Sequence, residues 1–412
     1  MPRTEFFESA VRQGFYGLDR SNLFGKKDNV RRYWEDIFIK ISIQKILERL
    51  LKKKSRLRIA DLGCGSGEGF ELLTHVPHSN PMQNRAPAEF VLSAAQIEYY
   101  EGLDISPSMV DQGKQNYSKY KNVRFQQTDL SKGFPLMGEK SFDLYFSSYG
   151  SLSHLTYDEL LTLSSQIFLH IDEEGYFVYD LYGRFSPEWP SYWDKSCHET
   201  LPYTMAYLLP KSRQAKDEVE WFNVTFWTGE ELKNLINSAA ATAGKKAEIV
   251  FLKDRSILVG RHMDTALLKD KVFRVRREVN KLFDRDYRGN LVELKLDLSY
   301  LSDKLKTHRK VYNRISSYYQ KWKTVIDTLE ALRTPKLSKA KNLIRNTKNS
   351  YLSGELKMLT WLYKNADRFP VVDFWASVAS PQAACILRNL ELSLPQGIGC
   401  GHGLSCVAKI TK

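Results

Sequence analysis

A run of glycines directly after a short apolar segment constrains the fold of this chain more than any other feature. The stretch RLRIADLGCGSGEGFELL covers residues 56–73. Its apolar part has the pattern of a buried strand end. Gly63 and Gly65 then allow a sharp turn and the close approach of a ligand, and Gly67 opens a helix. The stretch therefore predicts the first strand–turn–helix unit of a ligand-binding α/β sheet.

The glycine spacing does not fit the dinucleotide fingerprint G-x-G-x-x-G, which follows a strand in that fold. The third glycine position holds Glu68 when counted from Gly63, and Phe70 when counted from Gly65. Asp61, at the end of the strand, would repel a pyrophosphate and suits a cationic or amine-bearing ligand. An NAD-dependent oxidoreductase is therefore the less favoured interpretation.

The segment DLGCGSG, residues 61–67, resembles motif I of the class I S-adenosylmethionine-dependent methyltransferases. The resemblance covers roughly residues 29–264 and indicates no closer relative. It implies that S-adenosyl-L-methionine is the cofactor and that Asp61 acts at its methionine end. It further implies that Gly63, Cys64, Gly65 and Gly67 pass under the ribose.

Strands and helices alternate up to about residue 265, as a doubly wound sheet requires. A helix is expected over 29–54, with Trp34, Ile37, Ile41 and Leu47 among its apolar positions. Further strands are expected at 97–106, 123–130, 141–155 and 175–181, a helix at 228–238, and a last hairpin at 247–253 and 256–262. The predicted fold class is α/β, a Rossmann-like methyltransferase sheet followed by a mostly helical C-terminal extension with a long heptad helix.

Acidic residues end the second and third of these strands, at the edge where such sheets bind ligands. By the resemblance, Asp104 accepts hydrogen bonds from both ribose hydroxyls, with Ile105 beside it, and Asp129 with Leu130 contacts the adenine. The alternatives are ordinary: Asp104 could cap the helix that follows, and Asp129 could be a simple loop aspartate.

The segment after the fourth strand is expected to carry the chemistry, with Ser147 on the cofactor side. It lacks the acid-or-Asn, Pro-Pro-aromatic signature of many amide and base methyltransferases, which leaves oxygen, a ring or aliphatic amine, or carbon as acceptor. His154 and Tyr149 are the predicted catalytic residues, because a base beside the acceptor can contribute roughly 10²–10⁴-fold. Alternatively, His154 caps or packs under the next helix.

Two insertions interrupt the expected sheet. Residues 76–96 contain three prolines and predict a loop. Residues 182–227 are crowded with aromatic side chains, which favours either a lid over an organic acceptor or a small subdomain with its own core. The predicted substrate is therefore a small organic or glycan-like methyl acceptor.

Charge divides the chain. Of its 412 residues, those from 266 onward hold 28 Lys and Arg against 13 Asp and Glu, whereas residues 1–265 are nearly balanced. This asymmetry predicts an N-terminal helical cap at 1–54, a methyltransferase domain at 55–265 and a basic helical extension at 266–412. Truncation after Asp264 is then expected to leave cofactor binding intact.

A heptad pattern runs through the first part of the basic region. Its positions, all apolar or aromatic except His308, are Leu291, Leu294, Leu298, Leu301, Leu305, His308, Tyr312, Ile315, Tyr319, Trp322, Ile326 and Leu329. The pattern predicts one helix about 60 Å long, with a second helix returning over 337–366. Both an intramolecular antiparallel hairpin and a homodimeric coiled coil fit it.

The basic residues of this region are interpreted as a solvated helical face. The alternative is a surface for a polyanion such as RNA, a phosphorylated glycan carrier or acidic lipid headgroups, and an RNA methyltransferase is the corresponding alternative function.

Cys400, His402 and Cys406, with Cys385 more distant, lack the paired spacing of zinc ligands, so no metal is expected. The five cysteines do not suggest a disulfide framework, and a cytoplasmic location is expected.

Overall fold

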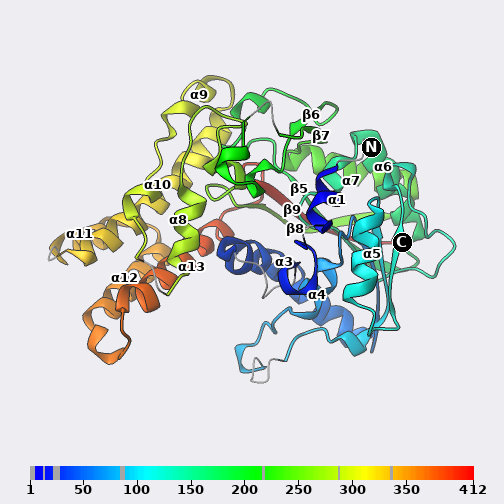
Figure 1. Cartoon of the computed structure of the whole chain (residues 1–412), viewed down its shortest axis with the longest axis horizontal. Helices are drawn as coiled ribbons and strands as arrows, with labels where there is room; N and C mark the ends of the chain where they lie inside the picture. Colours follow the sequence, from blue (N-terminus) through cyan, green and yellow to red (C-terminus); the bar gives the residue numbers. More distant parts are fainter. Residues whose placement is uncertain are drawn as a thin grey trace.

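A seven-stranded sheet forms the centre of the molecule (Figure 1), with the order β3-β2-β1-β4-β5-β9-β8. The computed structural model describes residues 5–12, 14–21, 28–83, 89–215, 219–285, 288–334 and 337–412. The strands of the sheet are β1 (Leu57–Leu62), β2 (Ile97–Asp104), β3 (Val123–Gln127), β4 (Leu144–Phe146), β5 (Glu174–Tyr182), β8 (Lys246–Arg255) and β9 (Gly403–Thr411).

The first five strands are parallel, so their carboxyl ends share one edge of the sheet. β9 lies antiparallel between β5 and β8 and pairs with both along its length. The doubly wound fold predicted from the sequence is confirmed. The predicted last hairpin is wrong, because residues 256–262 form no strand and β8 pairs with the end of the chain instead.

Helices cover both faces of the sheet. They are α3 (Asp36–Lys53), α4 (Glu68–Thr74), α5 (Pro107–Asn116), α6 (Tyr157–His170) and α7 (Gly229–Ala243). The cores on the two faces alternate along each strand: Val407 packs with α3, α4 and α5, whereas Cys406 and Ala408 pack with α6 and α7. Capping boxes start α6 and α7, at Thr156 and Thr228. A π-helical turn precedes α3, and Ile41, expected among its apolar positions, is exposed.

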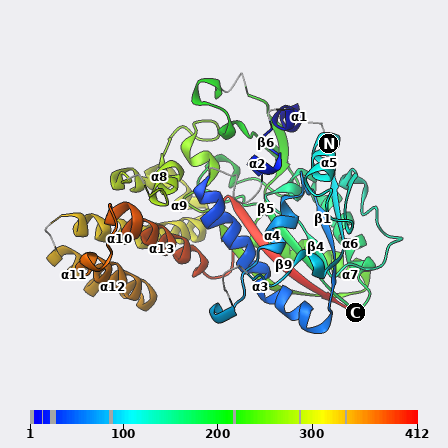
Figure 2. The same cartoon turned by 60° about the horizontal axis from the view of Figure 1, so that its bottom comes forward.

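Residues 256–402, called the helical insertion below, lie between the neighbouring strands β8 and β9. Its helices are α8 (Val275–Leu282), α9 (Lys304–Thr307), α10 (Arg309–Arg333), α11 (Leu337–Asn346), α12 (Ser350–Lys364) and α13 (Ser380–Leu392). They form a body beside the sheet, and α3 lies alongside β9 with this body on its other side (Figure 2). The segment from 266 onward is therefore not an extension beyond the sheet, because its last residues complete the sheet.

The heptad pattern does not form one continuous helix. Residues 291–301 make two 3₁₀ turns, where Asn290 and Asp297 accept hydrogen bonds from the backbone N–H groups of Val292 (3.1 Å) and Ser299 (2.9 Å). The helix starts only at Arg309 and spans about 37 Å. Its apolar face packs within the chain, against α11, α12 and α13.

The smaller elements lie outside the central sheet. They are the short helices α1 (Glu5–Arg12) and α2 (Leu18–Ser21), and the two-stranded sheet of β6 (Thr200–Tyr203) and β7 (Phe222–Thr225). β6 and β7 belong to residues 182–227, which have an aromatic core of their own. Among the described helices, none has the length and apolar character needed to cross a membrane.

Removal of β9 is expected to unfold the protein. Leu404, Val407 and Ile410 are fully buried; each contributes about 1.5–3 kcal/mol, against a typical net stability of about 5–15 kcal/mol. A chain ending at residue 402 should lose its cooperative thermal transition in circular dichroism. Deletion of the exposed Lys412 alone is the control and should leave the transition in place. A cooperative melt of the 402-residue chain would contradict the role given to β9.

Candidate functional site

The glycine turn after β1 leaves one position open toward a ligand. Gly63, Gly65 and Gly67 all have positive φ angles, of 69°, 54° and 93°. A Cβ at Gly63 would lie 2.5 Å from the Cβ of Ser151, and one at Gly67 would lie 2.6 Å from the ring of Tyr117. A Cβ at Gly65 would meet no atom within 4 Å. Gly63 and Gly67 therefore allow close packing, while Gly65 borders free space.

Asp104 joins the end of β2 to this turn. Its Oδ2 accepts a hydrogen bond from the N–H of Gly65 (2.8 Å) and its Oδ1 accepts one from the N–H of Ser106 (2.9 Å). Burial raises the pKa of the carboxyl group against the effect of these bonds. Ser106, not Asp104, caps α5 through its Oγ. The carboxylate is therefore held beside the open glycine and does not serve as a helix cap.

Asp61 and Cys64 lie beneath the turn. The hydroxyl of Tyr100 donates a hydrogen bond to Asp61, whose carboxylate occupies the place where a side chain at Gly69 would project. Burial raises the pKa of Asp61 to about 7. The Cys64 side chain is buried, and burial also raises its pKa. Both side chains therefore support the glycine turn from the interior of the protein.

The other predicted cofactor residues follow the neighbouring strands of the same edge. Asp129 accepts hydrogen bonds from the N–H (3.0 Å) and Oγ (2.7 Å) of Ser131 and so caps the 3₁₀ turn that begins at Leu130. Ser147 is buried, and its Oγ has no hydrogen-bond partner in the part of the chain that the structure describes. Ile105 is partly exposed beside Asp104.

These residues fit the cofactor that the motif implies. The strand order places the ends of β3, β2, β1 and β4 side by side, so the predicted contacts for adenine, ribose and methionine lie along one edge. The open face of Gly65, the fixed carboxylate of Asp104 and the unpaired hydroxyl of Ser147 can accommodate a ribose-bearing ligand.

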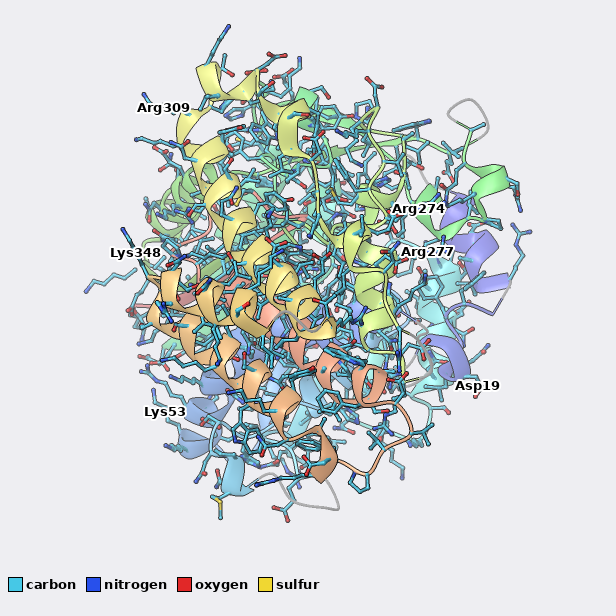
Figure 3. All side chains as sticks on the ribbon, turned by 90° about the vertical axis from the view of Figure 1, so that its left-hand side faces the viewer. Asp19, Lys53, Arg274, Arg277, Arg309 and Lys348 are labelled. Atoms are coloured by element: carbon cyan, nitrogen blue, oxygen red, sulfur yellow. The ribbon has the colours of Figure 1, made fainter. Side chains whose placement is uncertain are left out.

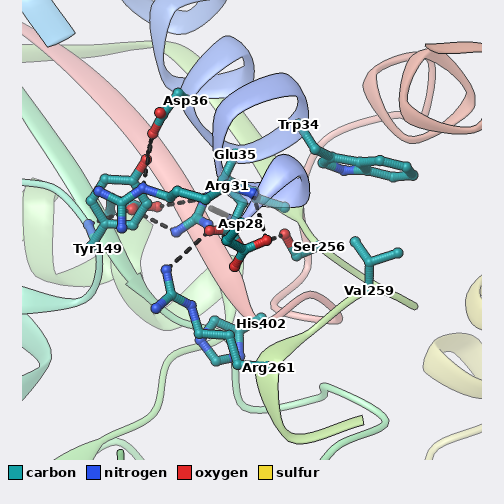
Figure 4. Close-up of polar contacts among 12 residues, drawn as sticks. Asp28, Arg31, Trp34, Glu35, Asp36, Tyr149, Ser256, Val259, Arg261 and His402 are labelled. Atoms are coloured by element: carbon teal, nitrogen blue, oxygen red, sulfur yellow. Dashed lines mark hydrogen bonds and ion pairs between the residues drawn. The ribbon is translucent and has the colours of Figure 1, made fainter. Parts of the chain in front are cut away.

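The turn after β4 touches the glycine turn directly, because Ser151 Oγ donates to the carbonyl of Gly63 (2.8 Å). Within it, Tyr149 adopts a positive φ of 57°, which is uncommon for a residue with a side chain. The guanidinium of Arg31 lies 3.1 Å above the centre of its ring, and its hydroxyl donates to Asp36 (Figure 4). Tyr149 is thus fixed from both sides at the edge of the site.

A buried ionic cluster surrounds Glu35 beside Tyr149 (Figure 4). Arg276 (2.9 Å), Arg261 (3.0 Å) and Arg255 (3.6 Å) each place a guanidinium nitrogen near its carboxylate. Burial alone would raise the pKa of Glu35, but the arginines hold it well below its usual range. Arg255 also binds Asp180 of β5 (2.7 Å). The cluster therefore connects the π-helical turn before α3, two sheet strands and the helical insertion.

Arg31 extends the network to the glycine turn. It binds Asp36 (2.9 Å) and Glu68 (2.7 Å), the first residue of α4. The side chain of Asn116 donates to the carbonyls of Tyr16 (3.1 Å) and Ser66 (3.3 Å), which holds the N-terminal segment against the same turn.

Aromatic residues form a wall against His154, which ends the 3₁₀ turn that follows Tyr149. The ring of His154 stacks on the ring of Phe222, with centroids 5.1 Å apart. Phe222 also contacts the ring of Tyr203, which in turn stacks on Tyr182. Burial lowers the pKa of His154 to about 4. His154 is therefore neutral at neutral pH, and it packs against the insertion of residues 182–227.

The sequence did not indicate the ionic cluster. Arg31 and Glu35 lie one helical turn apart just before α3, and this spacing is only a weak indication of an ionic cluster. Arg276 lies far from them in the sequence. Glu391 of α13 was also missed: it accepts hydrogen bonds from the N–H groups of Ser256 (2.6 Å) and Ile257 (3.0 Å) and from Trp34 Nε1 (3.2 Å). Only the tertiary fold brings these residues together.

Of the three residues considered as zinc ligands, two have other side-chain partners and the third is buried in a strand. Cys400 Sγ donates to Asp254 (3.1 Å), His402 Nδ1 lies 2.8 Å from Glu188, and Cys406 is buried in β9. Within the described ranges, no group of three or more metal-ligating side chains is present.

Comparison with known proteins shows what the sheet body is similar to. The model of a family described as a methyltransferase domain matches residues 53–240. No curated protein matches the chain. Similar solved structures include an S-adenosylmethionine-dependent methyltransferase from Clostridium acetobutylicum ATCC 824, with 14% identity, coverage of 52% of this chain and 82% of that one, and a TM-score of 0.34.

Two further structures are similar at the same level. An S-adenosylmethionine-dependent methyltransferase from Mesorhizobium loti is 19% identical over 52% of this chain and 85% of that one, with a TM-score of 0.34. CalS10, an amino pentose methyltransferase from Micromonospora echinaspora, is 17% identical over 61% of this chain and 92% of that one, with a TM-score of 0.32. Because these TM-scores are low, the assignment rests on the family model and the glycine turn.

Gly65→Ala should weaken cofactor binding more than it destabilises the fold. The new methyl group would project into the space bordered by Asp104, so the dissociation constant for S-adenosylmethionine should rise by at least about tenfold in calorimetry. Gly244→Ala is the matched control, since Gly244 has a φ of 64° and an equally open Cβ position at the end of α7. Equal binding by both variants would contradict the placement of the cofactor.

Arg276→Met should destabilise the protein although Arg276 belongs to the helical insertion. Its loss leaves Glu35 with two arginines, and breaking a buried ion pair costs about 3–5 kcal/mol. Arg277→Met, at the exposed neighbouring position, should change the free energy of unfolding by less than about 0.5 kcal/mol. Urea denaturation of both variants measures the difference, and similar values would show that the cluster is not a stabilising centre.

Proposed function

We propose that this chain, whose residues 53–240 match the model of a family described as a methyltransferase domain, is a class I S-adenosylmethionine-dependent methyltransferase that methylates an oxygen or nitrogen atom of a small organic or glycan-like acceptor. The observation that supports the acceptor class is the partly exposed ring of His154, which ends the turn that contacts Gly63 and stacks on Phe222 of the aromatic core of residues 182–227. An organic acceptor with apolar surface fits beside such a ring.

The cofactor half of the site is assigned to the strand ends. Asp104 would hold the ribose hydroxyls beside the open face of Gly65, Asp129 and Leu130 would border the adenine, and Ser147 Oγ would supply a free hydroxyl. Asp61, buried under α4, would keep the turn in shape through Tyr100. When bound, S-adenosylmethionine supplies a methyl group on a positively charged sulfur that leaves readily.

The acceptor half is assigned to the turn after β4 and the wall. His154 is neutral, so a ring nitrogen can take the proton that an acceptor hydroxyl or amine loses as it is methylated. A pKa of about 4 makes it a weak base, so much of the rate enhancement is assigned to positioning.

Tyr149 is proposed to position the acceptor, because its hydroxyl is already bound to Asp36 and Arg31 covers its ring. The buried ionic cluster keeps this turn fixed, because Asp180, which binds Arg255, accepts a hydrogen bond from the backbone N–H of Tyr149. Tyr149 is therefore given no proton-transfer role.

The acceptor can be identified with labelled cofactor. Incubation of a cell extract with the protein and S-adenosylmethionine carrying a deuterated methyl group should label a small molecule, detected by mass spectrometry. The Gly65→Ala variant, with weakened cofactor binding, should leave the same mass signal much reduced. A label found only on RNA or protein would contradict the proposed acceptor class.

His154→Ala should retain cofactor affinity and lose at least about 100-fold in turnover. Since the pKa of His154 is about 4, the group is already neutral above about pH 5, and the rate should show no His154 inflection near pH 6.5. His198→Ala is the control, because the exposed His198 also contacts an aromatic ring, that of Tyr157. A loss below tenfold would make His154 structural.

A further inference from the structure

The outermost part of the helical insertion combines positive charge with exposed apolar side chains. From residue 331 to 354 the sequence contains six Lys and Arg and no Asp or Glu. This stretch includes α11 and the start of α12, which continues with Glu355 and Lys357. The pair α11 and α12 is called the outer hairpin. Figure 3 looks onto this side of the molecule, with α11 and α12 across it and Lys348 extending away from the ribbon.

An open groove lies between the two helices of the outer hairpin. Its lining residues are Lys341, Ile344, Arg345, Thr347, Ser353 and Lys357. Lys341, Arg345 and Lys357 are exposed, and no ion pair to them is found within the described residues. The groove therefore presents three cationic groups and two hydroxyl groups around an aliphatic side chain.

The basic face continues into an apolar one along α12. Lys357, Trp361 and Lys364 follow at spacings of four and three, so they share one face of the helix. The Trp361 side chain is 51% exposed. Its ring lies 6.5 Å from that of Phe369, which begins the loop after α12.

This loop, residues 369–374, carries two exposed valines, called the valine loop below. Val371 is 43% exposed and Val372 is completely exposed. The base of the loop is held, because Asp373 binds Arg288 (2.7 Å) and Phe374 packs near Phe369 (6.1 Å). The valines are therefore presented to solvent on a fixed support.

We propose that the outer hairpin and the valine loop dock on a bilayer surface with anionic headgroups. Lys341, Arg345 and Lys357 would bind lipid phosphate and carboxylate oxygens, each charge adding to the attraction of an anionic leaflet. Trp361 would lie at the headgroup level, where its ring is favoured, and the valines would enter the acyl boundary. This inference does not depend on the identity of the methyl acceptor.

The apolar part of the surface favours a bilayer over a nucleic acid. RNA phosphates could bind the same cations, but the bases of single strands stack on aromatic or guanidinium planes. Trp361 and Arg345 offer such planes, but the aliphatic valines at the loop tip do not. Transfer from water to the acyl region stabilises these valines, so they favour a bilayer.

Sedimentation with sucrose-loaded vesicles tests the proposal on the full chain. The protein should sediment with vesicles of phosphatidylcholine and phosphatidylserine in equal parts, and not with phosphatidylcholine alone. Lys341→Gln, Arg345→Gln and Lys357→Gln together should lower the partition constant roughly a hundredfold. Val371→Ser with Val372→Ser should lower it at least about tenfold.

A second triple variant controls for net charge. It combines three exposed lysines of the sheet body: Lys45→Gln, Lys52→Gln and Lys121→Gln. It should change the partition constant by less than about threefold, since these lysines belong to α3 and to the turn before β3 and not to the outer hairpin or the valine loop. All variants should keep the wild-type thermal transition and S-adenosylmethionine affinity, which separates docking from folding.

Three results would overturn the proposal. The first is no sedimentation with either vesicle, and the second is an equal loss in both triple variants. The third is retention on single-stranded RNA, abolished in the first triple variant, without sedimentation on anionic vesicles; it would assign the surface to a nucleic acid.

Discussion

The carboxylate of Glu35 is the interaction on which the rest of the structure depends. It lies with no exposure to solvent among three arginines, from the end of β8, from the turn after it and from α8. A buried charge of this kind is tolerable only when its partners are in place. α3, the sheet edge and the helical insertion are therefore fixed relative to one another by one group, and the turn that carries Tyr149 is built on the same network.

Besides its two chain connections, to β8 and to β9, the helical insertion makes further side-chain contacts with the sheet body. Glu391 holds the backbone after β8, and burial raises its pKa to about 7 while three N–H groups donate to it. Lys304 and His308 bind Asp194, in the aromatic insertion of residues 182–227. The helical insertion thus contacts both the ionic cluster around Glu35 and the aromatic insertion of residues 182–227.

Local patterns predicted the parts of the site that depend on short stretches of chain. The sequence predicted three such features, because each depends on a few consecutive residues. They are the glycine turn, the acid after β2 and the alternation of strands and helices. The last strand was misplaced because β8 pairs with residues beyond the helical insertion, and no local pattern encodes that distance. The heptad pattern failed where Asn290 and Asp297 offer the backbone competing hydrogen bonds. The cluster around Glu35 could not be found, since its arginines are scattered in sequence and charged residues are ordinarily assigned to the surface.

Because β9 lies between β5 and β8, the sheet cannot be completed until β9 has been synthesised. When β5 and β8 have left the ribosome, the strand that belongs between them has not been synthesised, and the whole helical insertion must follow first. Both neighbours then expose unpaired backbone groups for the time needed to add those residues, at a rate of roughly 5–20 residues per second. An insertion that folds early could shield these edges and bring the final strand to the gap. The nascent chain is therefore most prone to wrong strand pairing late in its synthesis, when most of its helices have already formed.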